Sequence, residues 1–152
     1  MSIRIGINGF GRIGRLVTRA GWHIPEIDFV HINEPHGGIE CATHLLKHDS
    51  IHGHFDRQIS YEENRITVDR SVINFSEFET PEKINWDSSD VDIVIECSGK
   101  FRSIDSINQH FKSEVKKVIV ACPVKDLAAL NIVYGINDNL YDPKKHNVLT
   151  AA

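Results

Sequence analysis

The chain has 152 residues, a formal net charge of −4 and no basic run, which argues against nucleic acid or an anionic membrane as its main partner. Its length suits one domain with a sizeable core. Three scattered cysteines form neither a disulfide framework nor a CxxC zinc pair, and no apolar run approaches the ~20 residues of a membrane span. We therefore expect a cytoplasmic protein.

The first part of the chain alternates strands and helices. Residues 2–8 are rich in isoleucine and predict a buried strand, and residues 11–22 carry apolar side chains at helical spacing. A second strand is predicted at 26–33 and a second helix at 39–47. The order strand, helix, strand, helix is typical of a parallel sheet covered by helices.

The pattern changes after residue 49 and then returns to buried strands. Segments 55–61 and 64–75 are short and alternating, with a polar turn at 69–71, as in antiparallel hairpins. Further strands are predicted at 91–95, 115–121, 131–134 and 148–150, and a helix at 103–111. We expect an α/β fold with a mostly parallel twisted sheet, helices on both faces and an antiparallel hairpin insertion.

A G-x-G-x-x-G motif at residues 9–14 lies between the first strand and the first helix, the setting of a Rossmann-type dinucleotide site. Gly9 would make the tight turn, Gly11 would let the backbone approach a pyrophosphate, and Gly14 would let helix and strand pack closely. The positive helix end would attract phosphate, and Arg12 would add a cation. The alternative is an accidental glycine turn.

An acidic residue is expected about 20 positions after this motif, at the end of the second strand. Glu34 follows Asn33 there. Its carboxylate would accept hydrogen bonds from an adenosine ribose and would repel a 2′-phosphate, which favours NAD over NADP. A surface glutamate without such a role is the alternative.

Other candidates give weaker signals. Ser98 and Gly99 follow a buried strand, where they would face a ligand or form an ordinary strand-to-helix loop. Residues 121–123 end the next strand on the same expected edge. His44 and His48 have i, i+4 spacing, but nine histidines make a chance pair easy, so we expect no metal. No nucleophile–base pair is visible, so no catalytic residue is assigned.

The chain resembles the glyceraldehyde-3-phosphate dehydrogenase family in IGINGFGRIGR at 5–15, HINE at 31–34, HLLKHDSIHGHF at 44–55 and LTAA at 149–152. Within this stretch, INE at 32–34 also resembles erythrose-4-phosphate dehydrogenases. The loops ECSGKFRS at 96–103, ACPVKD at 121–126 and ALNIVYGINDNLYDP at 129–143 look most like the branch found beside arsenate-resistance permeases. The resemblance implies a cytoplasmic, NAD-dependent phosphorylating aldehyde dehydrogenase that acts on a small aldehyde phosphate and forms a homotetramer.

Cofactor-binding positions follow from the motif and the resemblance: Asn8, Gly9, Phe10, Gly11, Arg12, Ile13, Gly14, Asn33, Glu34, Ser98, Gly99, Phe101 and Ala121. The turn would hold the pyrophosphate, and the loop after residue 97 would follow the adenosine and the nicotinamide ribose. Two departures from the family bear on affinity. Glu79 stands where an arginine often flanks adenine, and Ala121 stands where a serine lies near the nicotinamide.

The resemblance also implies that residues 1–152 are the NAD-binding half alone, with the catalytic cysteine and its base lying further on. We expect no turnover from this half. Its exposed apolar surface would favour self-association or strand exchange through the C-terminal strand. The alternatives are a free-standing dinucleotide-binding or interaction module, an erythrose-4-phosphate dehydrogenase, or another dehydrogenase class on the same fold.

Overall fold

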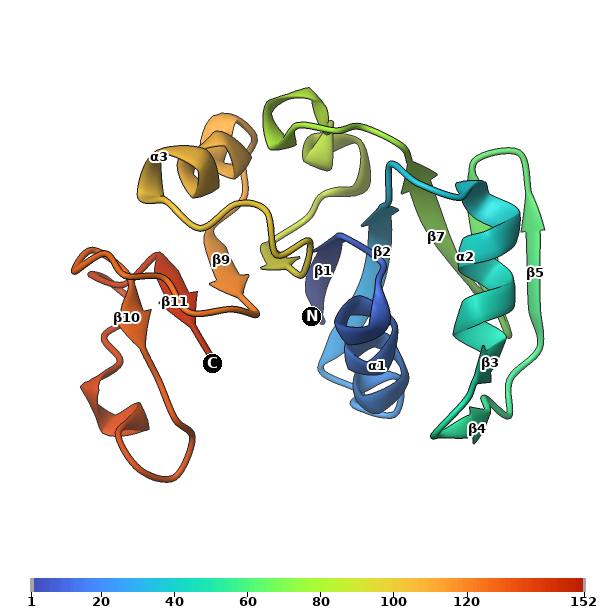
Figure 1. The fold of residues 1–152 in the computed structure, drawn as a ribbon, viewed down its shortest axis with the longest axis horizontal. Coiled ribbons are helices and arrows are strands. Elements are labelled where there is room, and N and C mark those ends of the chain that lie inside the picture. Colours follow the sequence, from blue (N-terminus) through green and yellow to red (C-terminus); the bar gives the residue numbers. More distant parts are fainter. Residues whose placement is uncertain (1, 152) are drawn as a thin grey trace.

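A computed structural model describes residues 2–151, whose main feature is a nine-stranded sheet with helices on both faces (Figure 1). Met1 and Ala152, the two ends of the predicted domain, lie outside these residues. The strand order is β10-β11-β9-β8-β1-β2-β7-β6-β5. These strands are β1 Ile3–Asn8, β2 Ile27–Asn33, β5 Ile59–Glu62, β6 Arg65–Val68, β7 Ser71–Ser76, β8 Ile93–Glu96, β9 Lys117–Val120, β10 Leu130–Asn131 and β11 Val148–Thr150.

The sheet is parallel from β10 to β7 and antiparallel only through β5, β6 and β7. A separate antiparallel pair joins β3, His48–Asp49, to β4, Gly53–His54. The predicted α/β class with a hairpin insertion is therefore confirmed. Asp69 and Arg70 form the turn between β6 and β7, close to the predicted polar turn.

The two faces of the sheet carry separate cores. Ile5 and Ile7 of β1 pack with α1, Arg12–Gly21, and α2, Gly38–Lys47. On the opposite face, a Cβ on Gly6 would lie 2.7 Å from the ring of Trp86, so this strand position needs a glycine. Alternation along the strand thus sends neighbouring residues into different cores.

Several predicted boundaries are wrong. The strand predicted at 131–134 is only Leu130–Asn131, because the following backbone forms turns tied by the Asn137 side chain. The helix predicted at 103–111 is α-helical only over α3, Ile104–Ile107, and continues as a 3₁₀ helix at Asn108–Lys112. Serine and asparagine, which compete for backbone hydrogen bonds, weaken the longer helix.

The C-terminal strand β11 is not an edge of the sheet. It pairs with β9 on one side and with β10 on the other. Because its backbone is already paired on both sides, the expectation of an exposed C-terminal strand is wrong for these residues, and self-association of the chain stays a prediction. The edge position belongs to the two-residue β10.

Candidate functional site

The carboxyl ends of three adjacent strands bring the predicted site residues together. Asn8 at the end of β1 pairs with Asn33 of β2 on one side and with Glu96 of β8 on the other. The glycine turn follows β1 directly, and the loop of Ser98 follows β8. In open α/β sheets, ligands bind beyond this edge.

The three glycines of the motif have different surroundings in the turn between β1 and α1. Gly9 has a φ of +88°, and a Cβ there would lie 2.5 Å from the backbone of Ser98. A Cβ on Gly14 would collide with the carbonyl oxygen of Gly9. A Cβ on Gly11 would meet nothing within 4 Å. Gly9 and Gly14 are therefore required by the fold, whereas Gly11 borders open space.

The start of α1 is free for an anion. No side chain caps this helix, and its first turn carries no acidic residue. The first N–H groups of a helix have no intrahelical partner and carry partial positive charge. Arg12 is exposed at the same end. Ile13 is 48% exposed, whereas Phe10 is 2% exposed and packs in the core.

Glu34 joins the end of β2 to the glycine turn. Its Oε2 accepts a hydrogen bond from the backbone N–H of Phe10 at 2.6 Å, and its Oε1 accepts one from the N–H of His36 at 3.1 Å. The side chain is half-buried. A carboxylate has about four acceptor positions, so both oxygens keep capacity for ribose hydroxyls.

These segments surround a cleft with a volume of about 120 Å³. Six predicted residues line it, namely Asn8, Gly9, Gly11, Glu34, Ser98 and Phe101. Glu79, noted above as a departure from the family, lines it as well. The other lining residues are Pro35, His36, Phe78, Cys97 and Lys100. Sequence reasoning did not assign these five to the site, although each directly follows or neighbours a strand end.

Buried polar contacts beneath the cleft hold its walls in place. Asn8 Nδ2 donates to Glu96 Oε2, and the N–H and hydroxyl of Ser98 donate to Glu96 Oε1. His110 Nε2 lies 3.0 Å from Glu96 Oε2, and Trp86 Nε1 donates to His110 Nδ1 at 3.1 Å. Because Nδ1 accepts from Trp86, this network assigns the proton of a neutral His110 to Nε2.

Asn33 has a supporting position rather than a place in the cleft wall. Its Nδ2 donates to Asn8 Oδ1 and to the carbonyl of Phe78, both at 2.9 Å. Its Oδ1 accepts from the Ser76 hydroxyl and from the N–H of Phe78, also at 2.9 Å. All four hydrogen-bonding positions of the amide are occupied, so it fixes the Phe78 loop against Asn8.

Ala121 and Gly99 lie near the cleft without lining it. The N–H of Ala121 donates to the carbonyl of Glu96 at 2.9 Å, at the end of β9. Gly99 has a φ of +68°, and its carbonyl accepts from Arg102 Nε at 2.8 Å. This glycine lets the loop turn sharply between Ser98 and Phe101.

The site contains no activated thiol. Burial raises the pKa of Cys97 to about 12, with smaller contributions from Glu96 and Cys122. A thiol with such a pKa is almost entirely protonated at neutral pH and is a poor nucleophile. The arrangement suits binding of a phosphate-bearing ligand at a helix N-terminus.

His44 and His48, the pair considered for metal binding, do lie together. Their ring centroids are 4.9 Å apart, and the ring of His54 meets that of His48 edge to face with centroids 5.1 Å apart. Across residues 2–151, no group of three or more histidine, cysteine or acidic side chains is arranged to hold a metal ion. Nor does any helix in that range have the length and apolar character needed to cross a membrane.

The known proteins and the protein family that this chain resembles agree with one another. The family described as "Glyceraldehyde 3-phosphate dehydrogenase, NAD binding domain" matches residues 3–104. Over all 152 residues the chain is 53% identical to glyceraldehyde-3-phosphate dehydrogenase 3 of Nostoc sp. and 40% identical to glyceraldehyde-3-phosphate dehydrogenase of Geobacillus stearothermophilus. It is 37% identical to glyceraldehyde-3-phosphate dehydrogenase 1 of Bacillus subtilis. The chain covers 45% of the length of each of these three relatives.

Proposed function

Because the chain belongs to the family of glyceraldehyde-3-phosphate dehydrogenase NAD-binding domains, we propose that the cleft beside its glycine turn is the NAD site. One observation carries this proposal most directly. Gly11 borders open space at the uncapped start of α1, next to the carboxylate that bonds the turn. This combination offers N–H donors to a pyrophosphate and an acceptor to a ribose.

Positive and negative groups around the turn would bind different parts of NAD. The N–H groups at the start of α1 would bind the pyrophosphate, and Arg12 would add a mobile positive charge. Glu34 would accept hydrogen bonds from the adenosine ribose and would repel a 2′-phosphate at that position. We therefore expect NAD to bind in preference to NADP.

The remaining cofactor contacts are assigned by position. Ser98 and Phe101 would flank the adenosine and the nicotinamide ribose, since both line the cleft. Asn8 would act with them from the end of β1. Glu79 and Ala121 would reduce affinity relative to the arginine and serine that are common in the family, without changing how the cofactor lies.

The activity of a longer parent enzyme is a further part of the proposal. We infer a cytoplasmic, homo-oligomeric enzyme that oxidises an aldehyde phosphate, passes hydride to NAD and transfers the acyl group to phosphate or arsenate. The nucleophile for this chemistry would lie outside these residues, because Cys97, the cysteine that lines the cleft, is half-buried and its pKa is raised to about 12 by burial. On its own, the chain is expected to produce no NADH from any aldehyde.

The assignment of the parent enzyme to one branch of the family rests on the loops at 96–103, 121–126 and 129–143. Their sequences resemble those of the branch found beside arsenate-resistance permeases. We propose that branch for the parent enzyme. The alternative is an erythrose-4-phosphate dehydrogenase, and the aldehyde that the parent enzyme prefers distinguishes the two. Turnover of erythrose 4-phosphate in preference to glyceraldehyde 3-phosphate would contradict the proposal.

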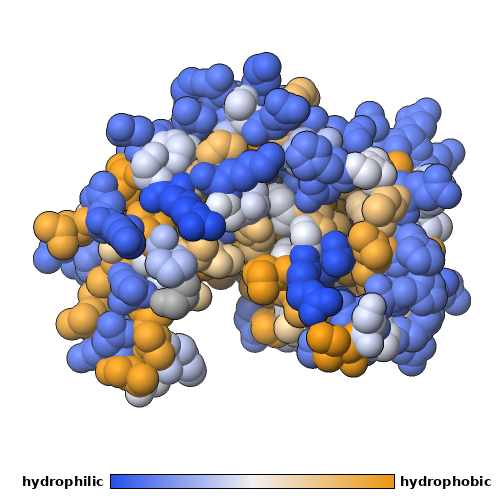
Figure 2. Space-filling view, in the orientation of Figure 1, coloured by the Kyte–Doolittle hydropathy of each residue, from blue (hydrophilic) through white to orange (hydrophobic). Residues whose placement is uncertain are grey.

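Residues 127–140, which we call the C-terminal lobe, expose large apolar side chains that would suit contact with a second domain. Leu127, Tyr134 and Ile136 are 105%, 91% and 79% exposed, and Figure 2 shows hydrophobic side chains gathered on the lobe that carries this segment. Several large apolar side chains on one lobe are unusual for a freely solvated surface. We propose that this lobe packs against the catalytic part of the parent enzyme.

The direct test of the proposed function is a calorimetric titration of the chain with NAD. We expect one NAD per chain, weaker binding of NADP and competition by ADP-ribose, because the turn holds the pyrophosphate and Glu34 the ribose. Absence of any NAD-dependent heat or chemical-shift change would instead favour an interaction module. Binding of NADP as tight as that of NAD would contradict the role of Glu34.

A further inference from the structure

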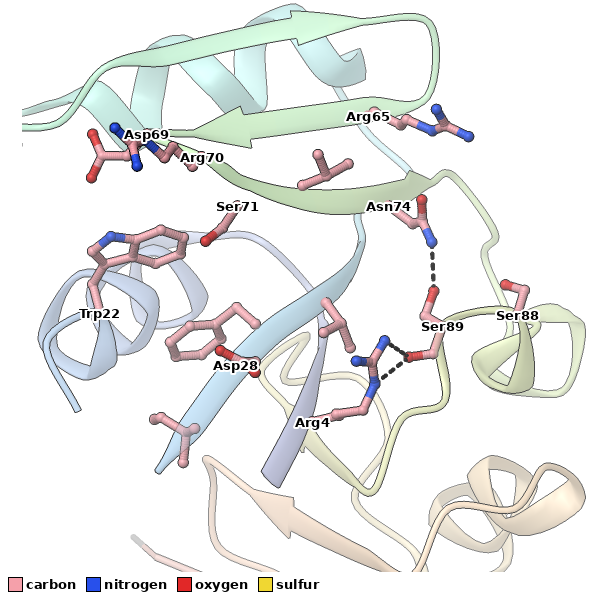
Figure 3. Close-up of a pocket in the computed structure, with 14 residues that line it drawn as sticks. Arg4, Trp22, Asp28, Arg65, Asp69, Arg70, Ser71, Asn74, Ser88 and Ser89 are labelled. Carbon is pink, nitrogen blue, oxygen red and sulfur yellow. Dashed lines mark hydrogen bonds between the residues drawn. The ribbon is translucent and has the colours of Figure 1, made fainter. Parts of the chain in front are cut away.

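A second cleft lies at the opposite end of the sheet from the glycine turn. β2 and β7 pair only through His31–Asn33 and Asn74–Ser76. On the amino-terminal side of these pairs the two strands separate, and a cleft of about 680 Å³ opens between them (Figure 3). We call it the β2–β7 cleft. Its volume lies in the range of small-molecule sites.

Three arginines line the β2–β7 cleft without a carboxylate partner. Within residues 2–151, none of Arg4, Arg65 and Arg70 takes part in an ion pair. The cleft also holds two aspartates, and Asp28 is the register partner of Arg4 on the neighbouring strand. Asp69 accepts from the side chain of Arg57 and from the N–H of Gln58, and Asp28 accepts from the Ser2 hydroxyl. Its three arginines outnumber its two aspartates, which gives the lining a formal charge of +1 in a chain of net charge −4.

One side of the cleft is polar and is joined by hydrogen bonds. Arg4 Nε and one terminal nitrogen donate to the carbonyl of Ser89 at 3.1 and 3.0 Å, which leaves its other terminal nitrogen free of that contact. Asn74 Nδ2 donates to the Ser89 hydroxyl at 2.8 Å. Ser88 lines the same side. A held guanidinium with spare N–H groups is a suitable partner for a phosphate.

The other side of the cleft is aromatic and apolar. Trp22 stacks on Phe29, with ring centroids 6.2 Å apart and planes 10° from parallel. Val72 of β7 also lines the cleft and is 54% exposed. Figure 3 shows Trp22 across the cleft from Arg4, Ser88 and Ser89, with Arg70 close to the tryptophan side. This side offers an apolar platform next to a cation.

We propose that the β2–β7 cleft binds a phosphorylated ligand with a flat ring, of about the size of a mononucleotide, at a site separate from the glycine turn. The phosphate lies toward Arg4 and Arg65, and the ring lies against Trp22 with Arg70 beside it. Neither part of the cleft belongs to the proposed NAD site, because no residue lines both clefts.

The test is an amide NMR titration of the chain with AMP while NAD is kept saturating, so that the first site is occupied. We expect shifts at the Trp22 indole N–H and at the amides of residues 27–30 and 71–74. Inorganic phosphate and adenosine, as separate probes, should each bind at least about tenfold more weakly than AMP, because each lacks one half of the contacts.

Variants distinguish this site from the NAD site. The exposed double change Arg65→Gln and Arg70→Gln should weaken AMP binding at least about tenfold and leave NAD binding unchanged. Lys125→Gln, an exposed and distant change of the same kind, should affect neither, and Arg12→Gln should weaken NAD alone. The proposal is overturned if AMP shifts no cleft amide at about 10 mM, or if the double variant binds AMP as Lys125→Gln does.

Discussion

The Oε2 atom of Glu34 lies 2.6 Å from the backbone nitrogen of Phe10, which ties the end of β2 to the middle of the glycine turn. The residue proposed to recognise the ribose therefore also holds the loop proposed to bind the pyrophosphate. The two parts of the site are mechanically connected, and a change at Glu34 should alter both.

Replacing Glu34→Gln should shift cofactor preference toward NADP. The amide keeps an oxygen for the Phe10 N–H but removes the negative charge that repels a 2′-phosphate. We expect the ratio of NADP to NAD affinity to rise at least about tenfold. Calorimetry with both cofactors measures this ratio, and Glu40→Gln on the exposed side of α2 serves as the control. An unchanged ratio would mean that Glu34 does not face the ribose.

Replacing His110→Leu should strongly destabilise the chain. His110 is 0% exposed, and its loss leaves the Trp86 N–H without its acceptor and the Glu96 carboxylate without one donor. Leaving buried polar groups unpaired costs about 3 kcal/mol of unfolding free energy in such a network. Urea unfolding measures the loss, and Asn108→Ala on the exposed side of the same segment should cost far less. Equal effects of the two changes would argue against the network.

His31 should make the chain less stable in mild acid. Burial lowers its pKa from 6.5 to about 4, so the unfolded chain binds this proton more readily than the folded one. The contribution of a neutral His31 to stability is therefore complete above pH 6.5 and is lost as the pH falls toward 4.

For this single group, we expect unfolding free energy to fall by about 2 kcal/mol between pH 7.5 and pH 5. Urea unfolding at both pH values measures the change, and His31→Gln should reduce it by that amount. The exposed His23→Gln should leave it intact. If His31→Gln lost as much unfolding free energy between pH 7.5 and pH 5 as the unchanged chain, another group would be responsible for the pH dependence.

The three cysteines should differ in reactivity. Cys41 is exposed, whereas Cys97 is half-buried and has its pKa raised to about 12. Relative to a thiol with the ordinary value of 9.0, Cys97 carries roughly a thousandfold less thiolate at pH 8. Iodoacetamide followed by mass spectrometry should label Cys41 first, and Cys41→Ser should remove this fast phase. Rapid labelling of Cys97 would contradict its placement.

The sequence predicted the glycine turn well because its signal is local. A strand, three spaced glycines and a helix lie within 20 residues, and each geometric demand falls on one of those residues. The parallel sheet was predicted from the order strand, helix, strand, helix along the chain. The 3₁₀ segment at Asn108–Lys112 and the short β10 were missed because their shape depends on side-chain contacts rather than on periodicity.

The support beneath the site could not be predicted in the same way. Trp86, His110, Glu96 and Asn8 come from four separate segments. The sheet register places Asn8 beside Glu96, and two 3₁₀ helices packed on the sheet add Trp86 and His110 to the same hydrogen-bonded chain. The β2–β7 cleft likewise depends on where two strands part. No spacing along the chain encodes either feature.

The most direct measurement of the proposed function compares NAD binding and thermal stability in Gly11→Ala and Gly14→Ala. The added Cβ at Gly11 meets no atom within 4 Å, whereas the one at Gly14 collides with the Gly9 carbonyl. We expect Gly11→Ala to keep the wild-type Tm and lose at least about tenfold in NAD affinity, because the methyl group occupies the space of the pyrophosphate. Gly14→Ala should instead lower the Tm. Full NAD affinity in a stable Gly11→Ala would contradict the placement of the cofactor at this turn.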